Sequence, residues 1–597
     1  MNKTNLKSWL PFVIIIGFIS LIVFFPSFKL HLSGDDYQSL WRYLLYKEGI
    51  IPGRWTDIKI FFTDYGPQDI FMQSVFQLFG LKPFFYYGFS YLSRLLAAFS
   101  FLPLIYFLTK SKAAAFFSSL LFSVATPGLE TTDWVFNMPS YLAIFFFNLF
   151  LITFFKLKEK YNSSLLLLSI LLFTITIVAM PIRMVFLPVL LVLSEGYWLI
   201  RNRKFSVIKD GFAKITVYII TFIIILAVTN IGGTIGLGYD SQRDVAGWKS
   251  NIEHYFSGIQ EPFSEKKYQY FLYPVGQIGN IIIPNNLIRP RWEILTRSRS
   301  LFFVVIPSFV VVYFALKFLK RSYPQITERS RRVSLIILSC WAVFVWFFFA
   351  APSKYQLATS VFMAMLFGGY VLTMLALLFI KNFKSKTNSY LILFAVLTII
   401  LSFAQYWVRN PNMVLVTYNR YFIIPAAGLA FLVGIIIGFA KNKSPIVVGS
   451  FCLVGLHMLS SFYYLNHLSK VREVKNTDNI RSAIPNIFTQ EKLKNSILFY
   501  FEPQGSEVLH HSLLFGFPVI MSIQYDFLSN VNLIYTDDWS EVVSAHQTGE
   551  GTRRFNPLKI EPVKLDNIYS YELFGFDLSE TTEETRSKLK DMDNDNR

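Results

Sequence analysis

Residues 9–25 read WLPFVIIIGFISLIVFF, a run of 17 residues without a charged side chain. About 20 apolar residues in a helix span the hydrocarbon core of a bilayer, and Lys3 and Lys7 stand shortly before this run. The chain continues as Phe25-Pro26-Ser27-Phe28-Lys29, which offers no small-residue cleavage site. The stretch therefore predicts an uncleaved helix that crosses a membrane.

Apolar runs of the same kind recur along the whole chain. Of its 597 residues, 53% are hydrophobic and 16% are charged, which excludes a disordered or fibrous protein. No fixed period of about 20 to 50 residues is visible, which excludes solenoids and propellers. We predict an α-helical polytopic membrane protein of about 13 spans, within a range of 11 to 13, at residues 9–25, 87–108, 113–127, 139–155, 164–180, 183–200, 212–230, 301–316, 333–350, 356–380, 389–408, 421–440 and 445–464.

The basic residues fall in alternate connections between these spans. A formal net charge of +18 would suggest a nucleic-acid partner in a soluble chain, but the alternation matches the excess of Lys and Arg in cytoplasmic loops. We therefore expect membrane lipid and no nucleic acid as a partner, a cytoplasmic N-terminus, and an extracytoplasmic segment after residue 465. High Ile, Phe, Lys and Asn usage fits a bacterium with AT-rich coding, and we expect the chain in the bacterial inner membrane.

Three outer segments are large, and they predict the domain organisation. Residues 26–86 and 231–300 form long outer loops of a membrane domain that covers 1–465. Strand-like runs such as 496–501 and 532–535 predict a small α/β or α+β domain over 466–577. The last residues, 578–597, are polar and charged, and we expect a disordered tail there.

The first outer loop opens with two adjacent carboxylates, Asp35 and Asp36, in the sequence Leu32-Ser33-Gly34-Asp35-Asp36-Tyr37. Such a pair at a membrane surface is costly unless it has a positive partner or a proton to handle. It could act as a base or hold a divalent ion against a phosphate. It could equally cap a helix expected over 38–46, and the residues alone leave both readings open.

Isolated cations mark three further outer positions. Arg183 follows Met180-Pro181-Ile182, Lys354 lies in Pro352-Ser353-Lys354-Tyr355, and Arg420 with Tyr421 begins the twelfth span. Each cation is either an anchor at a span end or a ligand for a lipid phosphate.

The acidic pair in the first outer loop, the basic residue before an apolar-Pro-apolar helix, and the late Arg420-Tyr421-x-x-x-Pro425 together resemble the glycosyltransferase-C superfamily. The pattern is most similar to the bacterial branch related to protein O-mannosyltransferases and aminoarabinose transferases. It covers residues 1–465 and leaves the C-terminal domain out. The chain departs from many relatives by Asp rather than Glu at position 36, and by Gln68-Asp69 where an apolar pair often follows the proline.

This resemblance implies a sugar donor on a polyprenyl phosphate and an active site on the outer face. It makes Asp35 the candidate base and Asp36 its orienting neighbour or a metal ligand. It assigns the donor phosphate to Arg183, and we add Lys354 and Arg420 as candidate phosphate ligands. Tyr37 and Tyr421, which adjoin these groups, are candidate substrate-binding residues.

The chemistry expected of these residues is an inverting single displacement. Fixed cations stabilise the charge that develops on the departing phosphate, and a carboxylate takes the proton of the attacking hydroxyl. The acceptor is a hydroxyl of a glycan, lipid or protein. No metal site is expected from scattered His or from two Cys, although Asp35 and Asp36 could hold a divalent cation.

Three other functions remain open. A secondary transporter or flippase of a lipid-linked or anionic substrate predicts two similar halves and charges near span centres, whereas most charge here is at span ends. A polymer ligase acting on a lipid-linked oligosaccharide would share the donor chemistry and differ in product size. A non-catalytic scaffold would tolerate replacement of Asp35.

Overall fold

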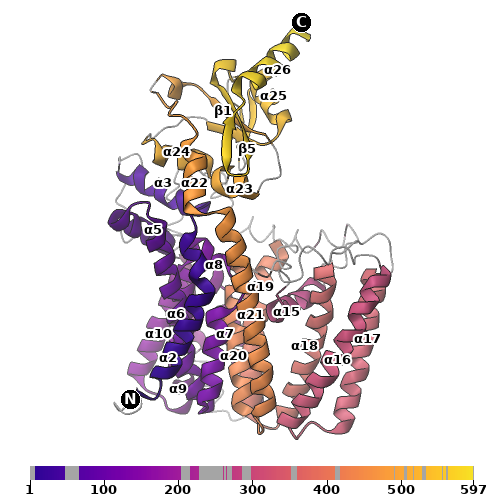
Figure 1. Cartoon of the computed structure of the whole chain (residues 1–597). Helices are drawn as coiled ribbons and strands as arrows, with labels where there is room; N and C mark the ends of the chain where they lie inside the picture. Colours follow the sequence, from indigo (N-terminus) through magenta and orange to yellow (C-terminus); the bar gives the residue numbers. More distant parts are fainter. Residues whose placement is uncertain are drawn as a thin grey trace.

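The computed structural model describes residues 7–47, 66–202, 215–227, 260, 264, 272–284, 298–350, 359–409, 417, 419–489, 491–502, 507–514, 516–526, 533–553, 556–559 and 562–595. These residues form a bundle of long helices with a small α/β domain at one end (Figure 1). The N-terminal end of the chain lies at the opposite end of the bundle (Figure 1).

Every predicted span contains an apolar helix in the described residues, so the predicted fold class is confirmed. Seven of the described helices are long and apolar enough to cross a membrane by length and composition. The bundle consists of α2 (Leu10–Phe24), α6 (Pro83–Thr109), α7 (Lys112–Val124), α9 (Pro139–Glu159), α10 (Ser163–Ala179), α12 (Leu187–Asn202), the helix Ile215–Ala227, α16 (Ser298–Ser322), α17 (Glu328–Ala350), α18 (Thr359–Asn382), α19 (Lys386–Arg409), α20 (Ile423–Phe439) and α21 (Ser444–Val471).

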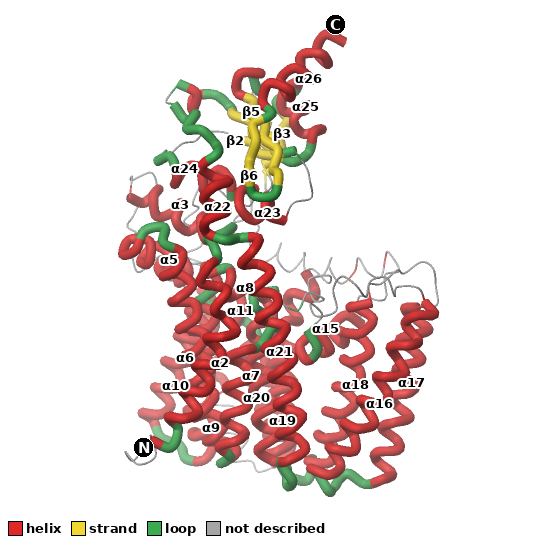
Figure 2. The backbone as a smooth tube through the Cα atoms, in the orientation of Figure 1, coloured by secondary structure: helices red, strands yellow, loops and turns green. Residues whose placement is uncertain are grey.

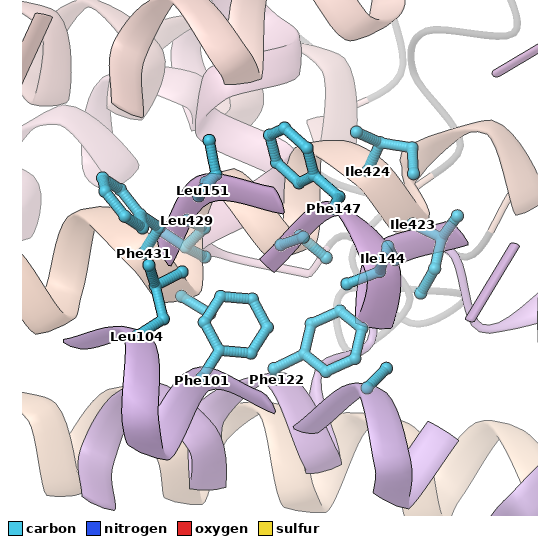
Figure 3. Close-up of a cluster of buried hydrophobic side chains, with 14 of the residues drawn as sticks. Phe101, Leu104, Phe122, Ile144, Phe147, Leu151, Ile423, Ile424, Leu429 and Phe431 are labelled. Carbon is cyan, nitrogen blue, oxygen red and sulfur yellow. The ribbon is translucent and has the colours of Figure 1, made fainter. Parts of the chain in front are cut away.

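The centre of the bundle is an apolar core between α6, α7, α9 and α20. Phe101, Phe122, Ile144 and Leu429 meet there and are almost fully buried (Figure 3). Apolar side chains on the outside of the bundle stay exposed, such as Phe18 of α2, Leu92 of α6 and Leu167 of α10, as a lipid-facing surface requires.

Basic residues from different connections lie together at the N-terminal end of the bundle. Lys112 Nζ donates to Ser8 Oγ at 3.1 Å, and Lys443 Nζ donates to Ser111 Oγ at 3.1 Å. The α6–α7 and α20–α21 connections therefore share one end with the N-terminus, as the alternation of charge predicts.

Short helices cover the other end. The helix expected over 38–46 is present as α3 (Asp35–Lys47), and the first loop contains a further helix, α5 (Gly66–Phe79). Asp69 fastens the two together, since it accepts hydrogen bonds from Ser39 Oγ at 2.8 Å and Arg42 Nε at 2.8 Å. The remaining short elements are η1 (Phe25–Lys29), α8 (Glu130–Asp133), η2 (Val135–Asn137), α11 (Pro181–Met184), α15 (Tyr273–Ile282) and η7 (Arg420–Phe422).

The C-terminal domain is built on a four-stranded sheet in the order β2-β1-β5-β6 (Figure 2). The central strand β1 pairs in parallel with β2 and β5, and β6 pairs antiparallel with β5. The predicted strands at 496–501 and 532–535 correspond to β1 and β2. The elements are α22 (Val474–Ser482), η8 (Lys492–Lys494), β1 (Ile497–Phe501), α23 (Glu507–Leu509), η9 (His510–Leu514), α24 (Phe517–Gln524), β2 (Leu533–Thr536), α25 (Trp539–Gln547), β3 (Glu550–Arg553), β4 (Asn556–Lys559), η10 (Leu565–Asn567), β5 (Ile568–Phe574), β6 (Asp577–Glu580) and α26 (Thr582–Asp595).

Both faces of this sheet are covered by helices. The side chains of β1 point alternately to one face and to the other. Phe499 and Phe501 point to the face covered by α24, whereas Leu498 and Tyr500 belong to the cluster with α25 and α26. The first of these clusters continues into the first outer loop, where it includes Leu32 of the membrane domain. The C-terminal domain and the first loop therefore share one hydrophobic core.

Two predicted boundaries differ in the structure. The prediction of disorder over 578–597 is wrong for the described residues, because β6 pairs with β5 and α26 packs on the sheet through Leu589. The helix α26 is held by a single buried leucine and by polar bonds such as that from Thr585 Oγ1 to Ser570 Oγ at 2.8 Å. Its sequence therefore shows no apolar periodicity that would predict a packed helix. In addition, α21 continues past residue 465 to Val471.

Candidate functional site

Three sequence motifs converge on one short stretch between α7 and α9. Residues 130–140, which we call the site segment, contain α8, η2 and the start of α9. Asp36, Arg183 and Arg420 all bond to this segment, although they lie in different parts of the chain. The site segment therefore joins Asp36 of the first loop to Arg183 and Arg420.

Asp36 is fully buried and caps backbone groups. Its Oδ1 accepts the N–H of Phe136 at 2.8 Å, and its Oδ2 accepts the N–H of Ser33 at 3.2 Å. These bonds agree with the alternative that Asp36 caps backbone N–H groups, and one of the two groups belongs to a second segment of the chain. Asp35 is the first residue of α3, and its side chain lies outside the described residues, so its role as base stays a prediction.

Arg183 is 1% exposed and anchors the site segment. Its Nη1 donates to Ser140 Oγ at 2.7 Å and to Thr131 Oγ1 at 3.2 Å, while Nη2 donates to Asn137 Oδ1 at 2.7 Å. The guanidinium also lies 5.8 Å from the centre of the Tyr421 ring. The role of Arg183 as a ligand of the donor phosphate stays a prediction, and in the structure its Nη atoms bond protein groups.

Arg420 is the more accessible cation. Its backbone N–H donates to Glu130 Oε2 at 3.1 Å, and its Nη1 lies 3.8 Å from the same oxygen. The guanidinium stacks 4.2 Å from the centre of the Trp134 ring and 5.3 Å from that of Tyr421. The side chain of Arg420 is 21% exposed, so it can reach a ligand at the outer surface without rearranging the core.

Glu130 and Asp133 of α8 were not among the site residues predicted from the sequence. Burial and the neighbouring Asp133 raise the pKa of Glu130 to about 7, against the lowering effect of Arg420. Burial also raises the pKa of Asp133 to about 6, although Arg472 and the hydroxyl of Tyr464 oppose it. The available signal was two carboxylates three residues apart on one helical face, followed by Trp134, in a short outer connection.

The corner that leads into the site segment is tightly held. Gly128 has φ +77°, and a Cβ there would lie 2.4 Å from the backbone nitrogen of Ile423. Arg94, which is fully buried, donates to Ala125 O at 2.6 Å at the end of α7 and to Thr132 Oγ1 at 3.2 Å in α8. These contacts fix α8 against the start of α20 and so against Arg420.

Another predicted residue, Tyr37, does not join this group. Tyr37 is buried beneath the C-terminal domain, where its hydroxyl bonds His31 Nδ1 at 2.8 Å and accepts from Arg481 Nη1 at 2.6 Å. Its role in substrate binding stays a prediction, as does that of Tyr421, which lies beside both arginines. Lys354 lies outside the described residues.

The expectation that no metal is required, with Asp35 and Asp36 able to hold a divalent cation, also stays a prediction. Within the described part of the chain, His, Cys, Asp and Glu form no group of three or more that could hold a metal. The side chain of Asp35, which the sequence suggests as a ligand together with Asp36, is not among the groups described.

Comparison with known proteins gives structural likenesses only. No protein-family model matches the chain, and no curated protein matches its sequence. Among solved structures, ArnT from Cupriavidus metallidurans in the apo state matches over 95% of this chain and 93% of its own, with 12% identity and a TM-score of 0.36. The archaeal oligosaccharyltransferase AglB from Archaeoglobus fulgidus, in complex with an inhibitory peptide and a dolichol-phosphate, matches over 83% of this chain and 62% of its own, with 12% identity and a TM-score of 0.34. Both proteins belong to the superfamily that the sequence motifs resemble, and likenesses with TM-scores this low assign no activity or substrate to this chain.

Proposed function

We propose that this chain is a membrane glycosyltransferase that moves a sugar from a polyprenyl-phosphate donor to an acceptor hydroxyl at the extracytoplasmic face. The observation that carries the proposal is the convergence of Asp36, Arg183 and Arg420 on the site segment. A donor of this class presents a phosphate at the membrane surface and a sugar above it. Cations at the outer ends of apolar helices can bind the phosphate, and carboxylates beside them can act at the sugar.

Arg420 is the residue that we assign to the donor phosphate. Breaking the glycosyl phosphate bond places negative charge on the departing phosphate, and a nearby guanidinium stabilises that charge most in the transition state. The exposed fraction of Arg420 and its stacking on Trp134 support this assignment. Both Nη atoms of Arg183 donate to the site segment, at Thr131, Ser140 and Asn137, so we assign it to positioning that segment. Lys354 stays a further candidate cation.

Asp35 is the proposed base. It takes the proton of the acceptor hydroxyl as that oxygen attacks the anomeric carbon on the face opposite the phosphate, so a single displacement inverts the anomeric configuration. Glu130 is a second candidate for this proton, because a pKa of about 7 lets it accept and release a proton near neutral pH. A divalent cation held by Asp35 and Asp36 would assist the departing phosphate.

The acceptor is a hydroxyl of a glycan, lipid or protein, and we place the chain in a bacterial inner membrane with a cytoplasmic N-terminus. The basic connections at the N-terminal end of the bundle support this orientation. In that orientation the site segment and the C-terminal domain lie on the extracytoplasmic side.

The experiment is release of polyprenyl phosphate from a panel of polyprenyl-phosphate sugars by purified protein, with a membrane extract as the source of acceptor. The Asp35→Asn variant tests the base, and Asp577→Asn on the exposed strand β6 is the matched control. We expect turnover of one donor class, a loss of at least about 100-fold in Asp35→Asn, and no change in Asp577→Asn. If no donor turns over in the folded wild type, transport or scaffolding is the better account.

A further inference from the structure

We propose that Arg472, which follows α21 at the start of the C-terminal domain, is a positioning residue that sets the distance between the first-loop acids and the site segment. The kinetic part of this inference rests on the proposed function. The structural part concerns residues 31–37, which we call the acidic turn, and it stands without any activity.

Arg472 bonds both acid-bearing segments with one nitrogen. Its Nη2 donates to the carbonyl oxygen of His31 at 2.6 Å and to that of Asp133 at 3.2 Å. The same nitrogen donates to Tyr87 Oη at 2.9 Å, and that hydroxyl lies 3.0 Å from His31 O and 3.1 Å from Asp133 O. One guanidinium and one phenol therefore join the acidic turn to α8.

The positive charge of Arg472 is compensated by nearby carboxylates. Arg472 is 1% exposed, and the carboxylates whose fields act on it most are those of Asp133 and Asp36, which are themselves buried. A buried guanidinium is costly unless carboxylates compensate it. Asp36 belongs to the acidic turn and Asp133 to the site segment, so the cation attracts both segments towards one point.

A second arginine holds the acidic turn from the side of the C-terminal domain. Arg481 of α22 donates from Nη1 to Tyr37 Oη at 2.6 Å and from Nε to Ser512 O at 2.9 Å. The ring of His31 bonds Asp478 Oδ1 at 3.0 Å through Nε2. Because burial and the nearby Arg481 lower the pKa of His31 to about 4, this ring is neutral at physiological pH and adds no positive charge beside the two arginines.

These bonds give the C-terminal domain a part in the reaction. Asp35 follows His31 by four residues and is carried on α3, whose start is fixed by the acidic turn. Loss of the bonds from Arg472 would leave the acidic turn joined to the site segment through Tyr87 and through the bond from the Phe136 N–H to Asp36, so the two segments would be held less firmly while each kept its own local structure. The distance between Asp35 and a donor held at Arg420 would then vary, and the chemical step would slow.

The test compares Arg472→Lys with the wild type. Lysine keeps the charge, but its side chain is one bond shorter than the path to Nη2, so its ammonium does not reach the position from which Nη2 bonds two carbonyls and a phenol together. We expect kcat for sugar transfer to fall at least about tenfold, with KM for the donor within about twofold, because a small misplacement of reacting groups slows chemistry more than binding. Tyr87→Phe removes only one hydroxyl from the same network and should give a smaller fall in kcat.

The matched control is Arg586→Lys. Arg586 belongs to the same domain and donates to Ile568 O at 3.1 Å and to Asp566 O at 3.0 Å, away from the acidic turn. It should leave kcat unchanged. Wild-type kcat in a folded Arg472→Lys protein, or an equal fall in Arg586→Lys, would overturn the inference.

Hydrogen–deuterium exchange of the full-length protein in detergent supplies a readout without turnover. In Arg472→Lys and in Tyr87→Phe we expect faster exchange of peptides that cover residues 31–37 and 130–137, with both segments affected together. Unchanged exchange, or a change in only one segment, would overturn the coupling even if the protein transfers sugar. A wild type without transferase activity would refute the proposed function and leave this measurement valid.

Discussion

Replacing Glu130 by glutamine should stabilise the protein at pH 8 and leave its stability nearly unchanged at pH 4. The side chain is 18% exposed, and burial together with Asp133 raises the pKa of its carboxyl from 4.5 to about 7 despite Arg420. The folded protein therefore binds a proton on Glu130 more tightly than the unfolded chain does. Glutamine has nearly the same shape as the protonated acid, so the substitution isolates the effect of charge.

The magnitude follows from linkage between protonation and folding. A rise in pKa from 4.5 to about 7 corresponds to about 3 kcal/mol of the free energy of unfolding. Below pH 4.5 the carboxyl is protonated in both states, and the wild type has no penalty. As pH rises from 4.5 to 7 the folded protein alone retains the proton, so its stability falls, and above pH 7 the loss is constant. Glu130→Gln should recover up to about 3 kcal/mol at pH 8 and almost nothing at pH 4.

The assay is unfolding of the purified protein in detergent at both pH values, beside the control Glu583→Gln. The side chain of Glu583 is 87% exposed, so this control should change stability little at either pH. A loss of stability in Glu130→Gln at pH 8 would mean that the ion pair with Arg420 outweighs the burial of the carboxylate. That result would refute the electrostatic reasoning about α8.

Three further outcomes follow from the same contacts. Arg420→Lys keeps the charge but loses planar stacking 4.2 Å from the Trp134 ring centre, and kcat/KM for the donor should fall about tenfold; an unchanged value would remove Arg420 from the phosphate site. Gly128→Ala should cost at least about 2 kcal/mol in unfolding measurements, because φ is +77° and the new Cβ would lie 2.4 Å from Ile423 N; a neutral effect would contradict the close approach. Deleting α26 (Thr582–Asp595) exposes an apolar face of the sheet and should lower the stability of the C-terminal domain by about 2 kcal/mol or more; wild-type stability would show that the helix is dispensable.

The helical bundle could be predicted from the sequence, because each span is an unbroken apolar run with charged residues at its ends. Strands such as Ile497–Phe501 were also predictable, since they are short apolar runs between turn residues. The helix α26 was not, because only Leu589 of its residues is part of a buried cluster. Helices held by polar bonds carry little hydrophobic periodicity.

The site was predictable in its parts and not in its assembly. Arg183 and Arg420 stand out as lone cations at span ends, and the structure brings both to the site segment. Glu130 gave a weaker signal, because a carboxylate in a short polar connection is ordinary. The bonds of Arg472 to the acidic turn could not be read from the chain, since they join backbone carbonyls more than 300 residues away.

The most direct test of the proposed transferase is a cryo-electron microscopy structure of the Asp35→Asn variant with a polyprenyl-phosphate sugar bound. The substitution should hold the donor uncleaved. We predict that the phosphate lies within hydrogen-bonding distance of Arg420, with the anomeric carbon facing residue 35 across the site segment. A donor bound elsewhere in the bundle, or a phosphate held without Arg420, would contradict the account.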